Sequence, residues 1–565
     1  LPVGMYTPSV RVRILSFSRI HVLLSVARLP LPASSLASLP SLPRARSTPM
    51  AAASSSSARG RHLLLRLLAL LAVAGNAAAA GSGAVVVGKK SAVLSLRELE
   101  WGAAARKIQG RYEQQSKAQI LGGHRKAEGA SRATTVLELK HHSPATISNQ
   151  PAGSEGYLSR LLAADAARAA SLQLPRPASI QSRQAAAQVP LTSGIRFQTL
   201  NYVTTIALGG DSSGAAAKLN VIVDTGSDLT WVQCKPCRAC YEQRDPLFDP
   251  ASSATYAAVP CNASACAASL KEATGAPGFC ARGGGGGGSE RCYYALGYGD
   301  GSFSRGVLAT DTVGLGGANL NGFVFGCGLS NHGLFGGTAG LMGLGRTELS
   351  LVSQTASRFG GVFSYCLPAT TSGDSSGSLS LGSDPSSYRN TTPVAYTRMI
   401  ADPAQPPFYF MNVTGASVGG AAMTASGLGA SNVLIDSGTV ISRLAPSVYR
   451  AVRAEFARQF SAAGYPAAPG FSLLDTCYNL TGHDEVNVPL LTLRLEGGAD
   501  VTVEAAGMLF MAKKDGSQVC LAMASLAYED QTPIIGNYQQ KNKRVVYDTV
   551  RSGLGFADED CSYNM

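Results

Sequence analysis

Acidic residues are scarce in the first third of this 565-residue chain, where the earliest one is Glu98. Residues 1–190 contain 24 Lys and Arg but only 7 Asp and Glu, whereas residues 191–565 contain 24 and 29. The net charge of +12 at pH 7 therefore comes from the leading segment, and the rest of the chain is mildly acidic. We expect no nucleic-acid partner for such a chain.

Long apolar runs are also lacking, since none approaches the roughly 20 residues that a membrane helix needs. We therefore expect no membrane anchor. The run LLALLAVAG follows Met50 and several basic residues and precedes small residues, which predicts a secretory signal at 50–80. Residues 1–49 are rich in Ser, Pro and Arg, and they are interpreted either as translated upstream sequence or as an organellar transit peptide.

Two common catalytic motifs are absent, a G-x-S-x-G nucleophile elbow and an H-E-x-x-H metal motif. The spacing C-x2-C-x2-C at 234–240 lacks a second half with metal-ligand spacing, so we expect no zinc site. The six glycines from Gly283 to Gly288 have no strand-to-helix fingerprint around them, which indicates a flexible loop rather than a phosphate cradle. The sequence predicts no metal and no cofactor.

The cysteines are absent until Cys234, and all twelve lie between it and Cys561. An even number behind a signal peptide favours six disulfides formed in an oxidising compartment. Glycosylation sequons at four positions agree with that route. The candidate glycosylation sites are Asn262, Asn390, Asn412 and Asn479.

The pattern of residue types changes near residue 201, from helical to β-rich. Helical patterns at 95–132 and 155–174 precede that point, with a short strand expected at TVLELKHHSP. Beyond it, short β-rich runs alternate with Gly, Pro, Asn and Asp, which predicts an all-β fold. The exception is SVYRAVRAEFARQF, whose apolar residues recur every fourth position from Val448 to Phe460 and predict a helix that packs on the core.

The chain repeats an unusual pattern in its β-rich part. VIVDTGS (221–227) and VLIDSGT (433–439) each drive an apolar strand into an Asp, which is costly unless the carboxylate is hydrogen-bonded or does chemistry. An apolar-apolar-Gly element follows each of them, GLMGLG at 340–345 and PIIGNY at 533–538. The pattern predicts two pseudo-twofold-related halves with one aspartate each.

Two aspartates held together can share one proton, because like charges a few Å apart do not both ionise. One can then activate a water molecule against a peptide carbonyl while the other donates a proton. Asp224 and Asp436 are the candidate catalytic pair. Gly226 and Gly438 would let backbone N–H groups approach the carboxylates, and four hydroxyls would hydrogen-bond within the loops or to the carboxylates: Thr225, Ser227, Ser437 and Thr439.

The motifs VDTGSDLTWV, IDSGTVISRL, GLMGLG and PIIGNY resemble those of pepsin-family aspartic peptidases over residues 200–565. The cysteine cluster after WVQC, the phrase YGDGS and the ending IIGNYQQKNKRVVYDTVRSGLGFADEDC are similar, more narrowly, to nepenthesin-like atypical plant aspartic proteases. The resemblance implies a bilobal pepsin-like acid protease fold, with two β lobes at 191–385 and 386–565 and a central cleft. It implies an aspartic endopeptidase that acts on polypeptides at acid pH, as a monomer.

The resemblance also assigns individual residues. Tyr298 matches the tyrosine of the flap hairpin that closes over bound peptide, Gly299 lies at the hairpin tip, and Trp231 matches the tryptophan that steadies that tyrosine. Segment 234–292 resembles a disulfide-braced loop of the first lobe. Two disulfides are implied, Cys366 with Cys561 and Cys477 with Cys520, and the pairing of the other eight cysteines stays open.

The basic segment 81–190 resembles an inhibitory propeptide, which would bind its own acidic enzyme until removed. Secretion to the apoplast or delivery to the vacuole is expected, with the chloroplast as an alternative. Two other functions stay open: a protein-binding inhibitor built on a catalytically weak or inactive relative of the fold, and a chloroplast nucleoid-associated protease. Intact Asp-Thr-Gly and Asp-Ser-Gly triplets argue against the first, and the acidic charge of residues 191–565 argues against the second.

Overall fold

A computed structural model of the chain describes residues 90–96, 155–173, 187–193, 197, 199–210, 216–282, 290–298, 301–369, 377–389, 391–430 and 432–562. All of them belong to one compact unit, Val86–Met565. The expected signal segment, most of the helical pattern at 95–132, the strand expected at TVLELKHHSP and the glycine loop 283–288 lie outside the described residues.

The largest sheet contains strands from both halves of the chain. From one edge to the other it runs β14 (Ala395–Arg398), β29 (Gly553–Asp558), β28 (Lys543–Asp548), β12 (Val362–Cys366), β13 (Gly377–Leu381), β2 (Ala187–Ser193), β3 (Tyr202–Leu208), β4 (Ala217–Asp224), β11 (Gly340–Gly343), β5 (Trp231–Gln233), β10 (Ala318–His332), β9 (Phe303–Leu315), β8 (Glu290–Gly297) and β7 (Phe279–Arg282), with β6 (Ala257–Ala258) beside β9. The pairing of β12 with β28 joins the two halves. The boundary expected between propeptide and enzyme at residue 190 falls inside β2.

Three smaller sheets belong mainly to the second half. The first runs β23 (Asp500–Thr502), β22 (Leu491–Leu495), β15 (Phe410–Val418), β17 (Asn432–Ile435), β27 (Ile534–Ile535), β18 (Ser442–Leu444) and β26 (Met523–Ser525), with β16 (Ala421–Ala422) on β15. The second runs β19 (Ala467–Ala468), β20 (Cys477–Tyr478), β25 (Val519–Leu521) and β24 (Leu509–Met511). The third pairs β1 (Ser91–Ser95) with β21 (Glu485–Pro489).

The two halves contain the same four-strand arrangement. In the first, β4, β11, β5 and β10 pair as parallel, antiparallel and parallel neighbours. In the second, β17, β27, β18 and β26 pair in the same order and sense. One Asp-containing loop follows β4 and the other follows β17, so the duplicated topology brings both loops to equivalent positions. The prediction of an all-β fold with two related lobes is confirmed.

Helices are few in the described part of the chain. They are α3 (Glu155–Ser171), α4 (Leu270–Thr274), α5 (Leu351–Gln354), α6 (Ala356–Phe359), α7 (Pro446–Ala462) and α8 (Ala505–Met508), with short 3-10 or π turns at Pro250–Ser252, Ala265–Ser269, Pro385–Ser387 and Asn537–Gln540. The predicted helix from Pro446 is confirmed, since Val448, Val452, Phe456 and Phe460 are buried along one side of α7. No helix of the described residues has the length and apolar character to cross a membrane.

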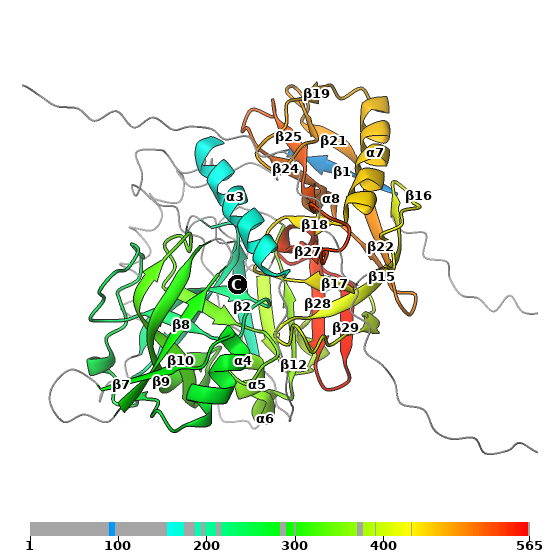
Figure 1. Cartoon of the computed structure of the whole chain (residues 1–565). Helices are drawn as coiled ribbons and strands as arrows, with labels where there is room; N and C mark the ends of the chain where they lie inside the picture. Colours follow the sequence, from blue (N-terminus) through cyan, green and yellow to red (C-terminus); the bar gives the residue numbers. More distant parts are fainter. Residues whose placement is uncertain are drawn as a thin grey trace, which may run out of the picture. The chain divides into compact units, whose positions relative to one another are not determined.

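Helix α3 lies between strands of the two halves. Figure 1 shows it in cyan, with the green strands of the first half on one side and the orange and red strands of the second half on the other. Its buried leucines, Leu158, Leu161 and Leu162, pack in one apolar cluster with Val440, Phe471 and Phe510 of the second half. Helix α3 therefore packs against the second half of the chain through apolar contacts with residues that are distant in sequence.

Candidate active site

Asp224 and Asp436 are brought together at the ends of related strands. Asp224 is the last residue of β4, and Asp436 directly follows β17. Both carboxylates are fully buried. The neighbouring parallel chain segments hold their backbones, because Asp224 O accepts from Leu344 N at 2.8 Å and Asp436 N donates to Ile535 O at 3.1 Å.

Each carboxylate accepts two hydrogen bonds from its own loop. Asp224 accepts from Gly226 N at 2.9 Å and from Ser227 Oγ at 2.5 Å. Asp436 accepts from Gly438 N at 2.8 Å and from Thr439 Oγ1 at 2.7 Å. The donor sets match one for one, as expected for loops of the same shape, and they compensate part of the cost of burying the charges.

The two loops also hydrogen-bond to each other. Thr225 N donates to Ser437 Oγ at 3.1 Å, and Ser437 N donates to Thr225 Oγ1 at 2.9 Å. Ser437 Oγ donates in turn to Val223 O at 3.1 Å. These buried, reciprocal bonds fix the distance between the loops, and hence between the carboxylates.

Gly226 and Gly438 lie where no side chain fits. A Cβ on Gly226 would come within 2.7 Å of Asp436 Oδ1, and one on Gly438 within 2.1 Å of Asp224 Oδ1. Each glycine therefore lies against the carboxylate of the other loop. The close approach of the two loops requires glycine at both positions.

The guanidinium of Arg168, on α3, lies between the two carboxylates. Its Nη2 donates to Asp224 Oδ1 at 2.7 Å and to Asp436 Oδ2 at 3.1 Å, and its Nε donates to Asp436 Oδ2 at 3.3 Å. The side chain of Arg168 is only 13% exposed. Sequence reasoning missed this residue, because a single arginine in a basic leader carries no signal of a partner 268 residues away.

The environment shifts the two pKa values in opposite directions. Burial raises the pKa of Asp224 above its usual range, although Arg168 counteracts the shift. Burial also acts to raise the pKa of Asp436, but the charge of Arg168 and the bonds from Thr439 and Gly438 outweigh it and lower that pKa. Burial acts to lower the pKa of Arg168, but the two neighbouring carboxylates outweigh it and raise that pKa, so the cation stays charged.

Tyr298 and Trp231 lie together beside the aspartates. Trp231 Nε1 donates to Tyr298 Oη at 2.8 Å, and both rings pack edge-on against Phe335, with ring centroids 4.9 Å and 5.6 Å away. Burial and the charge of Asp224 raise the pKa of Tyr298, so its hydroxyl stays protonated. Gly299, expected at the hairpin tip, lies outside the described residues.

Sequence reasoning also missed a third buried carboxyl, that of Asp228. Its Oδ1 accepts from Thr347 N at 2.9 Å, and burial raises its pKa to about 7. A Cβ on Gly345 would come within 2.3 Å of the same oxygen. The available signal was its position, four residues after Asp224 in the same motif.

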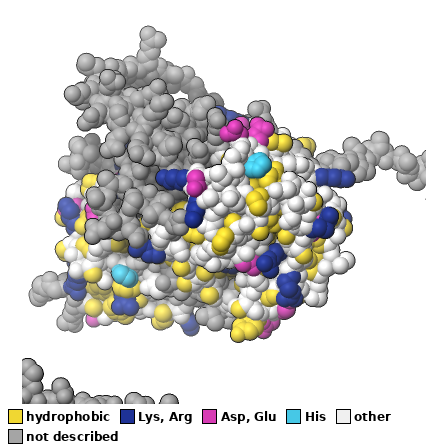
Figure 2. All heavy atoms as spheres, turned by 90° about the horizontal axis from the view of Figure 1, so that it is seen from above, with side chains coloured by type: hydrophobic (Ala, Val, Ile, Leu, Met, Phe, Trp, Pro, Cys, Tyr) yellow, Lys and Arg dark blue, Asp and Glu magenta, His cyan; other side chains and the backbone are white. Residues whose placement is uncertain are grey.

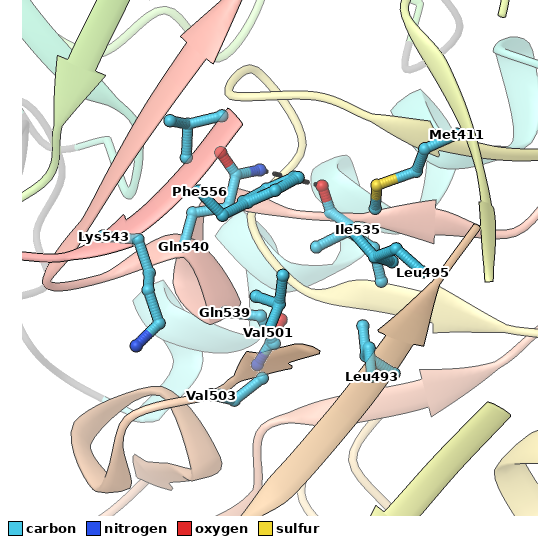
Figure 3. A pocket seen from close by; sticks show the side chains of 11 residues that line it. Met411, Leu493, Leu495, Val501, Val503, Ile535, Gln539, Gln540, Lys543 and Phe556 are labelled. Atoms are coloured by element: carbon cyan, nitrogen blue, oxygen red, sulfur yellow. Dashed lines mark hydrogen bonds between the residues drawn. The ribbon is translucent and has the colours of Figure 1, made fainter. Parts of the chain in front are cut away.

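A small cavity lies behind the Asp436 loop. Figure 3 shows its mostly apolar lining, with Phe556 beside Gln540, and Ile535 and then Met411 farther along the cavity. Gln540 Nε2 donates to Ile535 O at 2.9 Å, the dashed line in Figure 3, and to Asp436 O at 3.4 Å. These bonds hold the backbone at Asp436. We therefore interpret the lining of the cavity as part of the structure that positions the Asp436 loop.

Disulfides join all twelve cysteines: Cys234–Cys327, Cys237–Cys240, Cys261–Cys280, Cys266–Cys292, Cys366–Cys561 and Cys477–Cys520. The last two are the pairs that the resemblance implied.

Among the sequons, Asn262 and Asn479 are exposed, and Asn412 is half-buried with its Nδ2 donating to Glu496 at 3.3 Å. Asn390 lies outside the described residues.

Comparisons with known proteins agree on one family. Residues 202–383 match the family described as Xylanase inhibitor N-terminal, and residues 408–558 match Xylanase inhibitor C-terminal. An aspartyl protease family protein of Arabidopsis thaliana is 37% identical over 76% of this chain and 88% of its own length. The aspartic proteinase nepenthesin-1 of Nepenthes gracilis is 34% identical over 61% of this chain and 76% of its own length.

Solved structures show the fold. The structure titled edgp aligns with a TM-score of 0.53 at 22% identity, over 67% of this chain and 96% of that chain. Basic 7S globulin from soybean aligns with a TM-score of 0.53 at 19% identity, over 68% of this chain and 100% of that chain.

Proposed function

Because this chain belongs to the pepsin-like family of plant aspartic proteases, we propose that it is an endopeptidase that hydrolyses peptide bonds with water activated between Asp224 and Asp436. One observation carries the proposal: two fully buried carboxylates, on related loops, lie close enough to share one guanidinium nitrogen. Once that cation is gone, the pair can hold one shared proton, since two like charges so close do not both ionise.

In the proposed reaction the ionised aspartate takes a proton from water, and the water oxygen attacks the peptide carbonyl carbon. The protonated aspartate donates a hydrogen bond to the carbonyl oxygen and then protonates the leaving nitrogen. Donors of the two loops, Gly226 N with Ser227 Oγ and Gly438 N with Thr439 Oγ1, hold both carboxylates in place during these transfers. Tyr298, steadied by Trp231, would close over the peptide.

The chain with α3 in place would be the latent form. Arg168 occupies the space between the carboxylates and lowers the pKa of Asp436, so it opposes the singly protonated pair that the reaction needs. Acidification is proposed to release α3, since protonating the aspartates removes the charge that Arg168 binds. The segment 81–190 would then act as a propeptide, and its removal would expose the pair.

The test uses folded full chain converted at acid pH, with denatured haemoglobin as the substrate. We expect cleavage that pepstatin blocks. Asp224→Asn and Asp436→Asn should each reduce the rate of cleavage by at least about a thousandfold. Because the pair acts as a unit, the double variant should lose no more than either single variant. The matched control is Asp500→Asn, a surface aspartate paired with Arg494. If protein freed of the segment 81–190 cleaves no substrate at any pH from 2 to 7, the proposal is wrong.

A second candidate is a protein-binding inhibitor, which the description of the matching family as xylanase inhibitors favours. Both triplets and all their hydrogen-bond donors are present here, which supports the protease. Binding of microbial xylanases by converted protein, in the absence of any proteolysis, would favour the inhibitor.

Passage through the secretory route is part of the proposal. Disulfides that use all twelve cysteines support an oxidising compartment. On the face in Figure 2, Lys and Arg side chains are scattered among acidic and apolar ones over the described residues, without a basic patch. That face offers no support for the nucleoid-associated alternative.

A further inference from the structure

A second carboxylate of α3, that of Asp165, is bound by a compact set of donors beside the active site. Asp165 Oδ1 accepts from Val440 N at 2.5 Å, and its Oδ2 accepts from Ile441 N at 3.1 Å and from Arg443 Nη2 at 2.8 Å. The side chains of Asp165 and Arg443 are only 3% and 5% exposed. We call the three donors on Val440, Ile441 and Arg443 the carboxylate cradle.

The carboxylate cradle belongs to the second half of the chain and is held by bonds that do not involve α3. Val440 O accepts from Tyr538 N at 3.0 Å, and Ser442 N donates to Gln539 Oε1 at 3.0 Å. Arg443 lies on β18, opposite Ile534 of β27, and its Nη1 donates to Ile441 O at 2.6 Å. The donors are therefore positioned before any carboxylate arrives.

Removal of α3 would leave this cradle without its anion. Within the described residues, the one carboxylate paired with Arg443 is that of Asp165. Water would then take the place of the carboxylate on the guanidinium and the two backbone N–H groups, which the fold still holds in position. Charge-assisted hydrogen bonds to a carboxylate are stronger than the bonds to that water. The converted protein would therefore favour any ligand that returns a carboxylate to this place.

The cradle lies within reach of a peptide bound at the aspartates. Val440 is four residues after Asp436, and Thr439 between them bonds the Asp436 carboxylate. On α3, Asp165 precedes Arg168 by three residues, which is about 4.5 Å along a helix. Because an extended peptide advances about 3.3 Å per residue, a residue one to three positions from the bond between the aspartates spans a similar distance.

We propose that the carboxylate cradle is a specificity subsite, which binds an Asp or Glu side chain of the substrate within about three residues of the cleaved bond. The proposal rests on the proposed protease function and adds a substrate class to it. The side chains of Val440 and Ile441 belong to the apolar cluster that also contains the leucines of α3, Phe471 and Leu474. The favoured substrate thus carries an acidic side chain flanked by apolar ones.

The test compares peptides that differ only by Asp or Asn, placed in turn at each of the four positions on either side of the cleaved bond. The protein is full chain cut, after folding, at a site-specific protease sequence placed within residues 174–186. It is then freed of α3 in mild urea, which weakens the apolar contacts of the helix, and returned to buffer without urea. At pH 5, where a free Asp side chain is ionised, we expect one position at which Asp raises kcat/KM at least tenfold over Asn.

Variants at Arg443 assign that preference to the cradle. In Arg443→Met the Asp-to-Asn ratio should fall to about one, and Arg443→Lys, which keeps the charge without the fork, should restore part of it. The matched control, Arg450→Gln, removes a surface arginine paired with Glu529 and should leave the ratio unchanged. A preference absent at all eight positions, or retained in Arg443→Met, would overturn the proposal and leave the cradle as an anchor for α3 alone.

Binding keeps the subsite testable if the protein does not cleave peptides. The same Asp and Asn pairs are made with a reduced, uncleavable bond, and their Kd values are measured by calorimetry. Tighter binding of the Asp peptide by at least tenfold, abolished in Arg443→Met, would support the subsite even where the proposed protease function fails. Equal Kd values at every position would reject the subsite, whatever the outcome for activity. Far-ultraviolet circular dichroism and thermal unfolding check that Arg443→Met is folded, and Arg443→Lys serves for the comparison if it is not.

Discussion

At the scale of single residues, one guanidinium bridges two carboxylates. Arg168 bonds to both aspartates, and the pKa of Asp436 is lowered in its presence. A carboxylate with a lowered pKa contributes docking energy above its ordinary pKa, and that contribution is lost as the pH falls through the lowered value. The hold of Arg168 on the Asp436 carboxylate should thus be lost as the pH falls through the lowered pKa of that residue.

Arg168→Met should therefore shift conversion of the full chain to higher pH, by about one unit or more. The variant lacks the ion pairs of Arg168 at every pH, whereas the apolar contacts of the helix and the bonds of Asp165 remain. The measurement is the fraction of intact precursor after a fixed incubation from pH 3 to pH 7. Arg160→Met, which changes an exposed arginine on the same helix, is the control. Identical conversion profiles for Arg168→Met and the parent chain would show that Arg168 does not set the pH of conversion.

The residues of the two Asp loops could be predicted from sequence, whereas those of α3 could not. A strand that ends in Asp-Thr-Gly or Asp-Ser-Gly carries its own donors, so the bonds from Gly226, Ser227, Gly438 and Thr439 follow from local spacing. Arg168 and Asp165 bind partners in other parts of the fold, at separations of up to 278 residues. The residues around a charged side chain on a polar helix do not indicate which distant residue it will bind.

At the scale of elements, β1 is a short strand from the leader that completes a sheet of the second half. Residues Ser91–Ser95 pair antiparallel with β21, and Leu94 and Leu96 are buried in the main core. No strand is predicted here from the residues alone, because five residues show too little alternation to distinguish a strand from a helix end. Tertiary pairing with β21 decides the conformation.

Leu94→Ala should lower the free energy of unfolding of the full chain by about 2–5 kcal/mol, the usual range for removing a buried leucine side chain. Leu94 is only 3% exposed, whereas its neighbour Val93 is 65% exposed. Val93→Ala is therefore the matched control and should change the free energy by less than about 0.5 kcal/mol. Urea unfolding followed by tryptophan fluorescence gives both values. Equal effects of the two substitutions would mean that β1 is not docked as described.

At the scale of the whole molecule, the duplicated strand order explains why the two aspartates meet. The parallel pairing of β4 with β11 and of β17 with β27 supports each loop in the same way, and hydrogen bonds between Thr225 and Ser437 join the two loops. The repeat of the motif predicted this pairing. The continuous sheet through β12 and β28 was not predicted, since nothing in either strand specifies its partner.

The disulfide Cys366–Cys561 closes the longest loop in the described part of the chain, at a sequence separation of 195, and ties β12 to the residues after β29. In the chain-entropy view, a loop of that size restricts the unfolded state by about 5 kcal/mol, against about 2 kcal/mol for a loop as short as Cys237–Cys240. Replacing Cys366 and Cys561 together by Ala should therefore lower the free energy of unfolding by roughly 3 kcal/mol more than replacing Cys237 and Cys240 together. Guanidinium unfolding of the two double variants measures the difference. A larger loss from the short loop would mean that native contacts around Cys237–Cys240, rather than the entropy of the unfolded chain, dominate the contribution of these disulfides.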